Sequence, residues 1–305
     1  MDAPVKASAT HTAPALHSRR WSRLLRAALD APAHWEALDL PAGPLADAVE
    51  ALPLGPYRDA LHGVWLGHPL HPVLVQLPIG CWTSAALLDW VPGARHEADA
   101  LVTTGLLTAG PTALAGWVDW ARLDPPRRRT GLVHALANTA GVLLYTGSVL
   151  ARCRGRRARG RLLALAGLTA VSVGGTLGGH LAYEQAAGPN RAAAVPRLAP
   201  ADWVGLGAVD EFPPGEPVRR TAGGIPVVVV REGERCHVLA ERCAHLSGPL
   251  ADGTVVDGCL RCPWHGSEFR LRDGEVVHGP ATAPQPVFET RILSGHLEAR
   301  LPEAG

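Results

Sequence analysis

Two short stretches in the C-terminal third of the chain decide its fold: RCAHLSGPL at residues 242–250 and CPWHGSEF at residues 262–269. They give Cys243 and His245 in a C-x-H pattern and, after 16 residues, Cys262 and His265 in a C-x-x-H pattern. Two cysteines and two histidines suit a structural zinc site. They equally suit a [2Fe–2S] cluster that holds one iron through both thiolates and the other through both imidazoles. Zinc fingers take both cysteines from one turn and both histidines from a helix, so the spacing favours the cluster.

The sequence around these loops has the pattern of β-structure. A β-branched run at residues 227–230 is followed by a glycine-centred turn at 232–234 and a second apolar run at 237–240. Asp273-Gly274, between residues 269–271 and 275–277, is a strong hairpin signal. The sequence therefore predicts a small all-β domain over residues 201–305.

Together with GPATAPQP at residues 279–286, the two loops resemble the signature of the Rieske iron–sulfur fold over about residues 201–300. The resemblance implies one [2Fe–2S] cluster per subunit, with Cys243 and Cys262 on the buried iron and His245 and His265 on the outer iron. Ser267 matches a serine that hydrogen-bonds to the cluster sulfur in high-potential relatives.

The chain also departs from that pattern. Phe269 stands where high-potential relatives carry a tyrosine, and it cannot donate a hydrogen bond. One of two donors therefore remains, and we expect a reduction potential between those of ferredoxins and of cytochrome bc proteins. The additional disulfide of the cytochrome bc type is not expected, because Ser247-Gly248 and Trp264 stand in its place.

The N-terminal part reads as a membrane protein. Four apolar stretches lie at residues 72–90, 100–118, 131–149 and 162–182. Each is about 19–21 residues long, the length that a helix needs to cross a bilayer. They predict a four-helix transmembrane bundle at 62–186, joined by a linker at 187–200 to the β domain.

Four histidines fall near one end of these spans. His68 and His71 begin the first span, His134 lies one turn into the third, and His180 lies near the end of the fourth. Imidazoles from different helices are typical axial ligands of haem, so one hypothesis is that these histidines bind haem b or another metal. Hydrogen bonds to backbone or lipid headgroups are the alternative. Asp119, at the same end, is predicted to orient one of the ligand imidazoles.

The segments GHPLHPVLVQLPIG, GWVDW, GLVHALAN and GGHLAYE resemble a bacterial family of small four-helix membrane domains of unknown function, over about residues 62–186. The opening H-P-L-H-P is the most specific part of that resemblance. It implies no activity, so the haem hypothesis depends on the helix geometry alone.

The N-terminal leader, residues 1–61, is the least informative part. Residues 1–17 are predicted to be disordered, and residues 21–40 form either an interfacial helix or a solvated leader. Arginine counts beside the two ends of the spans are equal, so the positive-inside rule does not orient the domain. Without a cleavable signal we expect a cytoplasmic N-terminus, which also places the β domain on the cytoplasmic side of the inner membrane.

Charge and length exclude several functions. Lys and Arg total 29 against 28 Asp and Glu, so no general attraction to nucleic acid is expected. Only 40 residues follow His265, too few for the mononuclear-iron domain of a self-contained oxygenase. The leading hypothesis is a multi-pass, membrane-anchored one-electron carrier, an oxidoreductase component, that exchanges electrons with a haem b or a quinone in its membrane domain. The alternatives are a tethered ferredoxin for a separate reductase or oxygenase, whose helices only anchor it in lipid, and a redox sensor.

Overall fold

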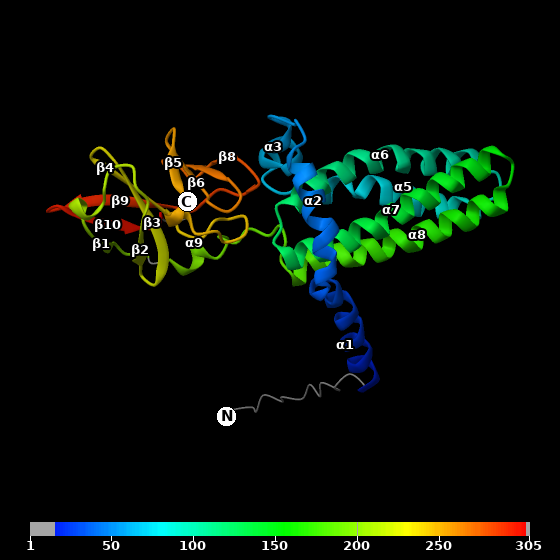
Figure 1. Cartoon of the computed structure of the whole chain (residues 1–305), viewed down its shortest axis with the longest axis horizontal. Helices are drawn as coiled ribbons and strands as arrows, with labels where there is room; N and C mark the ends of the chain where they lie inside the picture. Colours follow the sequence, from blue (N-terminus) through cyan, green and yellow to red (C-terminus); the bar gives the residue numbers. More distant parts are fainter. Residues whose placement is uncertain (1–15, 200, 303–305) are drawn as a thin grey trace, which may run out of the picture.

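The computed structural model describes residues 16–199 and 201–302, with side chains from residue 21 onward. A helical domain and a β domain lie end to end, with the β domain at one end of the helical bundle (Figure 1). The linker between them is packed. Ala192 is fully buried in the core of the β domain, and the short helix α9 (Val195–Leu198) follows it.

Three helices of the described chain are long and apolar enough to span a membrane. They are α6 (Arg95–Ala121), α7 (Pro125–Cys153), and α8 (Arg157–Gly179) continued through the π-helical turn η4 (His180–Glu184). Glycines let them approach closely. A side chain at Gly141 would place its Cβ 2.4 Å from Val171, and one at Gly167 would place it 2.9 Å from Tyr145.

The first predicted span is divided. Residues 71–88 form α4 (His71–Leu74) and α5 (Gln76–Leu88), and α5 has only 13 residues. Pro72 and Pro78 lie in the first turns of these helices, where a missing N–H is tolerated but a continuous helix is interrupted. The structure thus supports three spans by length and composition, and a fourth crossing stays a prediction.

Buried charges join the helices at the end of the bundle away from the β domain. The Arg152 guanidinium bonds both oxygens of Asp89 and, at 2.8 Å, Oδ1 of Asp99. Arg152 and Asp89 are 3% and 5% exposed at their side chains. Arg157 of α8 pairs with Asp99 as well, so this network ties α5, α6, α7 and α8 together.

The second half of the predicted leader packs on the helical domain. The described elements of the leader are α1 (Leu16–Asp30), η1 (Ala31–His34), η2 (Glu36–Leu38), α2 (Asp39–Glu50) and α3 (Tyr57–His62), and η3 (Val64–Leu66) follows it. Ala42, Ala46 and Val49 of α2 are buried against the end of α6. The disorder predicted for residues 1–17 falls almost wholly outside the described residues.

The C-terminal domain is all-β, as the sequence predicts, and its strands form two antiparallel sheets. Residues 227–230 lie in β3, residues 237–240 lie in β4, and Asp273-Gly274 connects β7 to β8. The six-stranded sheet has the order β1-β10-β9-β4-β3-β2 and the four-stranded sheet the order β5-β6-β7-β8. The remaining bounds are β1 (Val204–Ala208), β2 (Val218–Ala222), β3 (Ile225–Glu232), β4 (Arg235–Ala240), β5 (Thr254–Val256), β6 (Cys259–Arg261), β7 (Glu268–Arg270), β8 (Val276–His278), β9 (Val287–Leu293) and β10 (His296–Arg300).

Candidate iron–sulfur site and its contact with the helical domain

The four ligand-type residues of the sequence lie in two neighbouring loops. Cys243 and His245 follow β4, and Cys262 and His265 follow β6. The thiols are almost fully buried and hydrogen-bond to each other. The imidazole rings meet at the outer side of the loops, with centroids 5.0 Å apart and planes at 90°.

This grouping into a thiol pair and an imidazole pair bears on the kind of metal site. A mononuclear zinc site would require at least three ligating side chains that converge on one point. The described residues contain no such group. A thiol pair and an imidazole pair, each able to hold one iron, suit a two-iron cluster. His245 Nδ1 is buried and has no hydrogen-bond partner, which is the state expected of a ligand atom directed at a metal. The residues present therefore fit the cluster.

Burial keeps the two imidazoles of the site uncharged. Desolvation lowers the pKa of His245 to about 3 and that of His265 to about 4. Each imidazole is therefore neutral near pH 7, as metal ligation requires. The hydrogen bond from Cys243 lowers the pKa of Cys262 to about 7, while the same bond and burial raise the pKa of Cys243.

A buried glutamine fixes the first loop, and sequence reasoning missed it. Gln285 accepts the backbone N–H of Ala244 at 3.0 Å, and its amide donates to the carbonyls of Ala240 and Arg242, both at 2.7 Å. Ser267, fully buried in the second loop, accepts the backbone N–H of Ala281 at 3.0 Å. Its hydroxyl proton is thus left to donate elsewhere, consistent with the predicted bond to sulfur.

Comparison with known proteins identifies the β domain. The family model described as the Rieske [2Fe-2S] domain matches residues 202–289. The ferredoxin subunit of anthranilate 1,2-dioxygenase from Burkholderia cepacia is 38% identical over 101 residues, which cover 33% of this chain and 94% of that protein. The chain belongs to the Rieske [2Fe-2S] family.

A second ferredoxin agrees with this assignment. Ferredoxin CarAc of Metapseudomonas resinovorans is 30% identical to the Rieske domain over 97 residues, 31% of this chain and 90% of that protein. A solved complex of oxygenase and ferredoxin in carbazole 1,9a-dioxygenase matches at 27% identity with a TM-score of 0.31, over 33% of this chain and 94% of the other. The Rieske domain binds a [2Fe–2S] cluster and acts as an electron-transfer carrier.

The helical domain matches a second family, described as a predicted membrane protein (DUF2231), over residues 67–191. This match and the three apolar helices indicate that the protein associates with a membrane. The helical domain is called the membrane domain below.

Three loops of the Rieske domain, at residues 243–249, 262–267 and 278–285, form its cluster edge, and each contacts the membrane domain. Leu246 of the first loop is buried in a core with Val118 of α6 and Leu132 of α7. The second loop accepts a hydrogen bond at the carbonyl of His265 from Arg122, at 3.2 Å. In the third loop the backbone N–H of Gly279 donates to Asp59 of α3 at 2.9 Å. The imidazoles therefore face the end of the bundle.

Of the four bundle histidines, the structure brings His71 and His134 together, with ring centroids 6.2 Å apart. His71 Nδ1–H donates to the carbonyl of Thr112 at 2.9 Å, and His134 Nδ1–H donates to that of Gly174 at 2.7 Å. Glycines leave room for both rings: a Cβ at Gly116 would lie 2.8 Å from His71, and one at Gly178 would lie 2.9 Å from His134. A backbone acceptor on Nδ1 is the usual arrangement when Nε2 binds a metal.

The other two histidines do not join this pair. His180 lies 2.8 Å from the carboxylate of Asp30, and His68 is exposed and contacts the carbonyl of Pro69. Asp119 bonds His62 at 2.7 Å instead of one of the four predicted histidines. His62 is buried, and it lies against Gly279, whose Cβ would come within 3.2 Å of its ring. It has no motif of its own, so sequence reasoning missed it.

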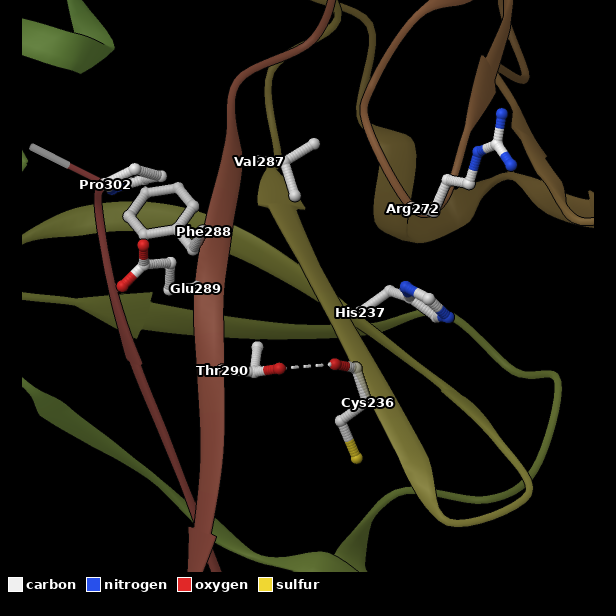
Figure 2. A pocket seen from close by; sticks show the side chains of 8 residues that line it. All are labelled: Cys236, His237, Arg272, Val287, Phe288, Glu289, Thr290 and Pro302. Atoms are coloured by element: carbon white, nitrogen blue, oxygen red, sulfur yellow. Dashed lines mark hydrogen bonds between the residues drawn. The ribbon is translucent and has the colours of Figure 1, made fainter. Parts of the chain in front are cut away.

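A separate hollow opens on the Rieske domain between β4, β9 and Arg272 (Figure 2). Cys236 lies at its wall and its carbonyl accepts a hydrogen bond from Thr290 at 3.0 Å. The hollow contains none of the four ligand-type residues, so it is not part of the cluster site.

Proposed function

We propose that this protein is a membrane-anchored one-electron carrier whose Rieske cluster exchanges electrons with an acceptor inside its own membrane domain. The observation that carries the proposal is the docked cluster edge. Leu246, Arg122 and Asp59 mark three separate contacts, one for each loop around the ligand-type residues. Electron exchange slows steeply with distance, so a contact at the imidazole side favours the membrane domain as the first redox partner.

The proposed ligands are Cys243 and Cys262 for the inner iron and His245 and His265 for the outer iron. The bound cluster supplies a centre that gains or loses one electron. The residues of the chain position it: Gln285 holds the first loop, Ser267 offers its hydroxyl to a sulfur, and the membrane domain covers the imidazole side.

The proposed acceptor is a haem b held by His71 and His134. Both rings have Nδ1 engaged by a backbone carbonyl, which orients them with Nε2 as the proposed ligand atom. Nε2 of His134 lies 3.3 Å from the Asn138 amide nitrogen, so the Asn138 side chain would have to turn away for this atom to bind a metal. His68 and His180 are less suited, because one is exposed and the other lies against Asp30. A quinone at the same end of the bundle is the alternative acceptor.

The first test is a dithionite-minus-air difference spectrum of the detergent-purified protein, with iron and acid-labile sulfide analysis. We expect haem α and Soret bands beside the broad Rieske absorption. The variants His71→Ala and His134→Ala should lose the haem bands and keep the Rieske absorption, whereas the matched control His68→Ala should keep both. Iron–sulfur absorption with neither haem nor bound quinone would refute the internal acceptor.

The second candidate function is a tethered ferredoxin that serves a separate oxygenase or reductase. It is favoured by the relatives, which include ferredoxin subunits of dioxygenase systems. In this case the helices only anchor the domain in lipid, and His71→Ala and His134→Ala leave the redox spectrum unchanged.

We also propose that the protein is a multi-pass protein of the inner membrane and that the Rieske domain faces the cytoplasm. Since α8 ends on the side of the cluster edge, a reporter fused to the C-terminus marks the side of the Rieske domain. A C-terminal green fluorescent protein should be fluorescent and a C-terminal alkaline phosphatase inactive, and the opposite result would place the domain outside.

A further inference from the structure

Arg122 connects the membrane domain to the ligand loop of the cluster. It follows directly after α6, and its side chain is 28% exposed. One guanidinium nitrogen donates to the carbonyl of His265 at 3.2 Å, and another pairs with the carboxylate of Glu50 at 2.5 Å. The cation is thus held in a fixed position beside a ligand-type residue by groups of both domains.

Two more arginines, Arg128 and Arg191, lie on the imidazole side of the cluster site. The backbone N–H of Arg191 donates to the carbonyl of Ala244 at 2.8 Å, and its guanidinium donates to the carbonyl of Ala186 at 2.6 Å. Arg128 of α7 donates to the carbonyls of Ala121 and Leu123 at the end of α6. Among the described residues neither guanidinium has an ion-pair partner within 4.0 Å, because the neighbouring carboxylates Asp124 and Asp39 pair with Arg127 and Arg129.

These charges act on the imidazole side. Arg122 contacts the second ligand loop at the His265 carbonyl, and Arg191 contacts the first ligand loop at the Ala244 carbonyl. The carboxylates nearby are Glu50, which is paired with Arg122, and Asp124, which is paired with Arg127. The arginines on this side therefore outnumber the carboxylates.

A positive surrounding favours the reduced form of the cluster. Reduction adds one electron and makes the cluster more negative by one charge, without forming or breaking a bond. A nearby cation stabilises that charge, most strongly where water is excluded. We propose that Arg122 of the membrane domain, assisted by Arg128 and Arg191, raises the reduction potential of the Rieske cluster. This inference rests on the ligand assignment of the proposed function but not on the presence of haem.

The experiment is a redox titration of the full-length protein, followed by the electron paramagnetic resonance signal of the reduced cluster. In Arg122→Gln, which keeps a donor for the His265 carbonyl, the midpoint potential should fall. A tenfold change in the ratio of reduced to oxidised cluster corresponds to about 59 mV for a one-electron couple. Arg122→Lys keeps the charge and should restore most of the potential. The matched control is Arg129→Gln, because Arg129 bonds Asp39 and the Ala33 carbonyl.

A second variant keeps the test informative if Arg122→Gln does not fold. Glu50→Gln removes the negative partner of Arg122, so the potential should rise instead of fall. An unchanged potential in Arg122→Gln with an intact Rieske signal, or an equal fall in Arg129→Gln, would overturn the inference. A wild-type protein without a Rieske signal would overturn the ligand assignment, and this inference with it.

Discussion

Asp59 of the membrane domain accepts the backbone N–H of Gly279 in the Rieske domain, with 2.9 Å between Oδ1 and the nitrogen. Its other oxygen accepts a hydrogen bond from the His278 ring at 2.8 Å. One carboxylate therefore holds the loop after β8 from a helix that precedes the first span. A backbone N–H that is held in this way would otherwise have to find water, so the bond contributes to docking.

Asp59→Ala should loosen this docking without unfolding either domain. Amide hydrogen exchange at residues 278–281 is expected to increase several-fold, because the bond at Gly279 is lost, while exchange in β3 and β4 stays slow. Hydrogen–deuterium exchange with mass spectrometry measures this. Asp47→Ala, at an exposed position of α2, is the control. Equal exchange in wild type and Asp59→Ala would show that the carboxylate does not hold the loop.

Gln285→Leu should destabilise the cluster loop. It removes the side-chain partner of the Ala244 N–H and of the carbonyls of Ala240 and Arg242. Each buried polar group that is left without a partner lowers the stability of the fold by about 1–3 kcal/mol. We expect a lower melting temperature and a lower iron content. Thr290→Val removes a side-chain bond to the Cys236 carbonyl, remote from the ligands. That control should lose some stability and keep its iron; a Gln285→Leu protein with full iron content would contradict the prediction.

Gly248→Ala should reduce cluster content. The added Cβ would lie 2.7 Å from Cys262 Sγ and 3.3 Å from the Trp264 ring. Overpacking of this kind costs about 1–3 kcal/mol, and here it acts on a proposed ligand. Iron and sulfide per protein should fall. Gly205→Ala, in β1 with open space around it, is the control. If both variants retain the same iron and sulfide, the space at Gly248 is not needed.

Arg152→Met should destabilise the membrane domain strongly. It leaves Asp89 buried without its main partner, and breaking a buried ion pair costs about 3–5 kcal/mol. Thermal unfolding in detergent should shift to a lower temperature. The double variant Arg152→Met with Asp89→Leu removes both charges and should recover part of the loss. If the double variant is less stable than Arg152→Met alone, the unpaired Asp89 charge is not the cause of the lost stability.

The parts of the fold that depend on residues close together in the sequence could be predicted from it. The ligand loops carry their pattern within a few residues, and the hairpin at Asp273-Gly274 follows from the turn itself. The division of the first span was missed because an average over 19 apolar residues conceals Pro72 and Pro78.

Contacts between segments that are far apart in the chain leave no local pattern in the sequence. Asp59 and Gly279 are 220 residues apart, and nothing in either segment indicates the other. For the same reason the pairing of His71 with His134 was one possibility among four histidines, and His62 was not considered. Which imidazoles meet depends on helix rotation, and rotation depends on packing at glycines such as Gly116 and Gly178.

One face of α6 carries contacts to three different parts of the molecule: Thr112 and Gly116 to His71, Asp119 to His62, and Arg122, just past its end, to His265. A single residue inserted between Gly116 and Asp119 would turn Asp119 and Arg122 by about 100° around the helix axis relative to Thr112 and Gly116. Restoring their direction would take about seven inserted residues, which would lengthen the helix by about 10 Å. The number of residues in this part of α6 therefore sets both the direction and the separation of the two candidate redox sites, and deletions or insertions there should be far less tolerated than substitutions.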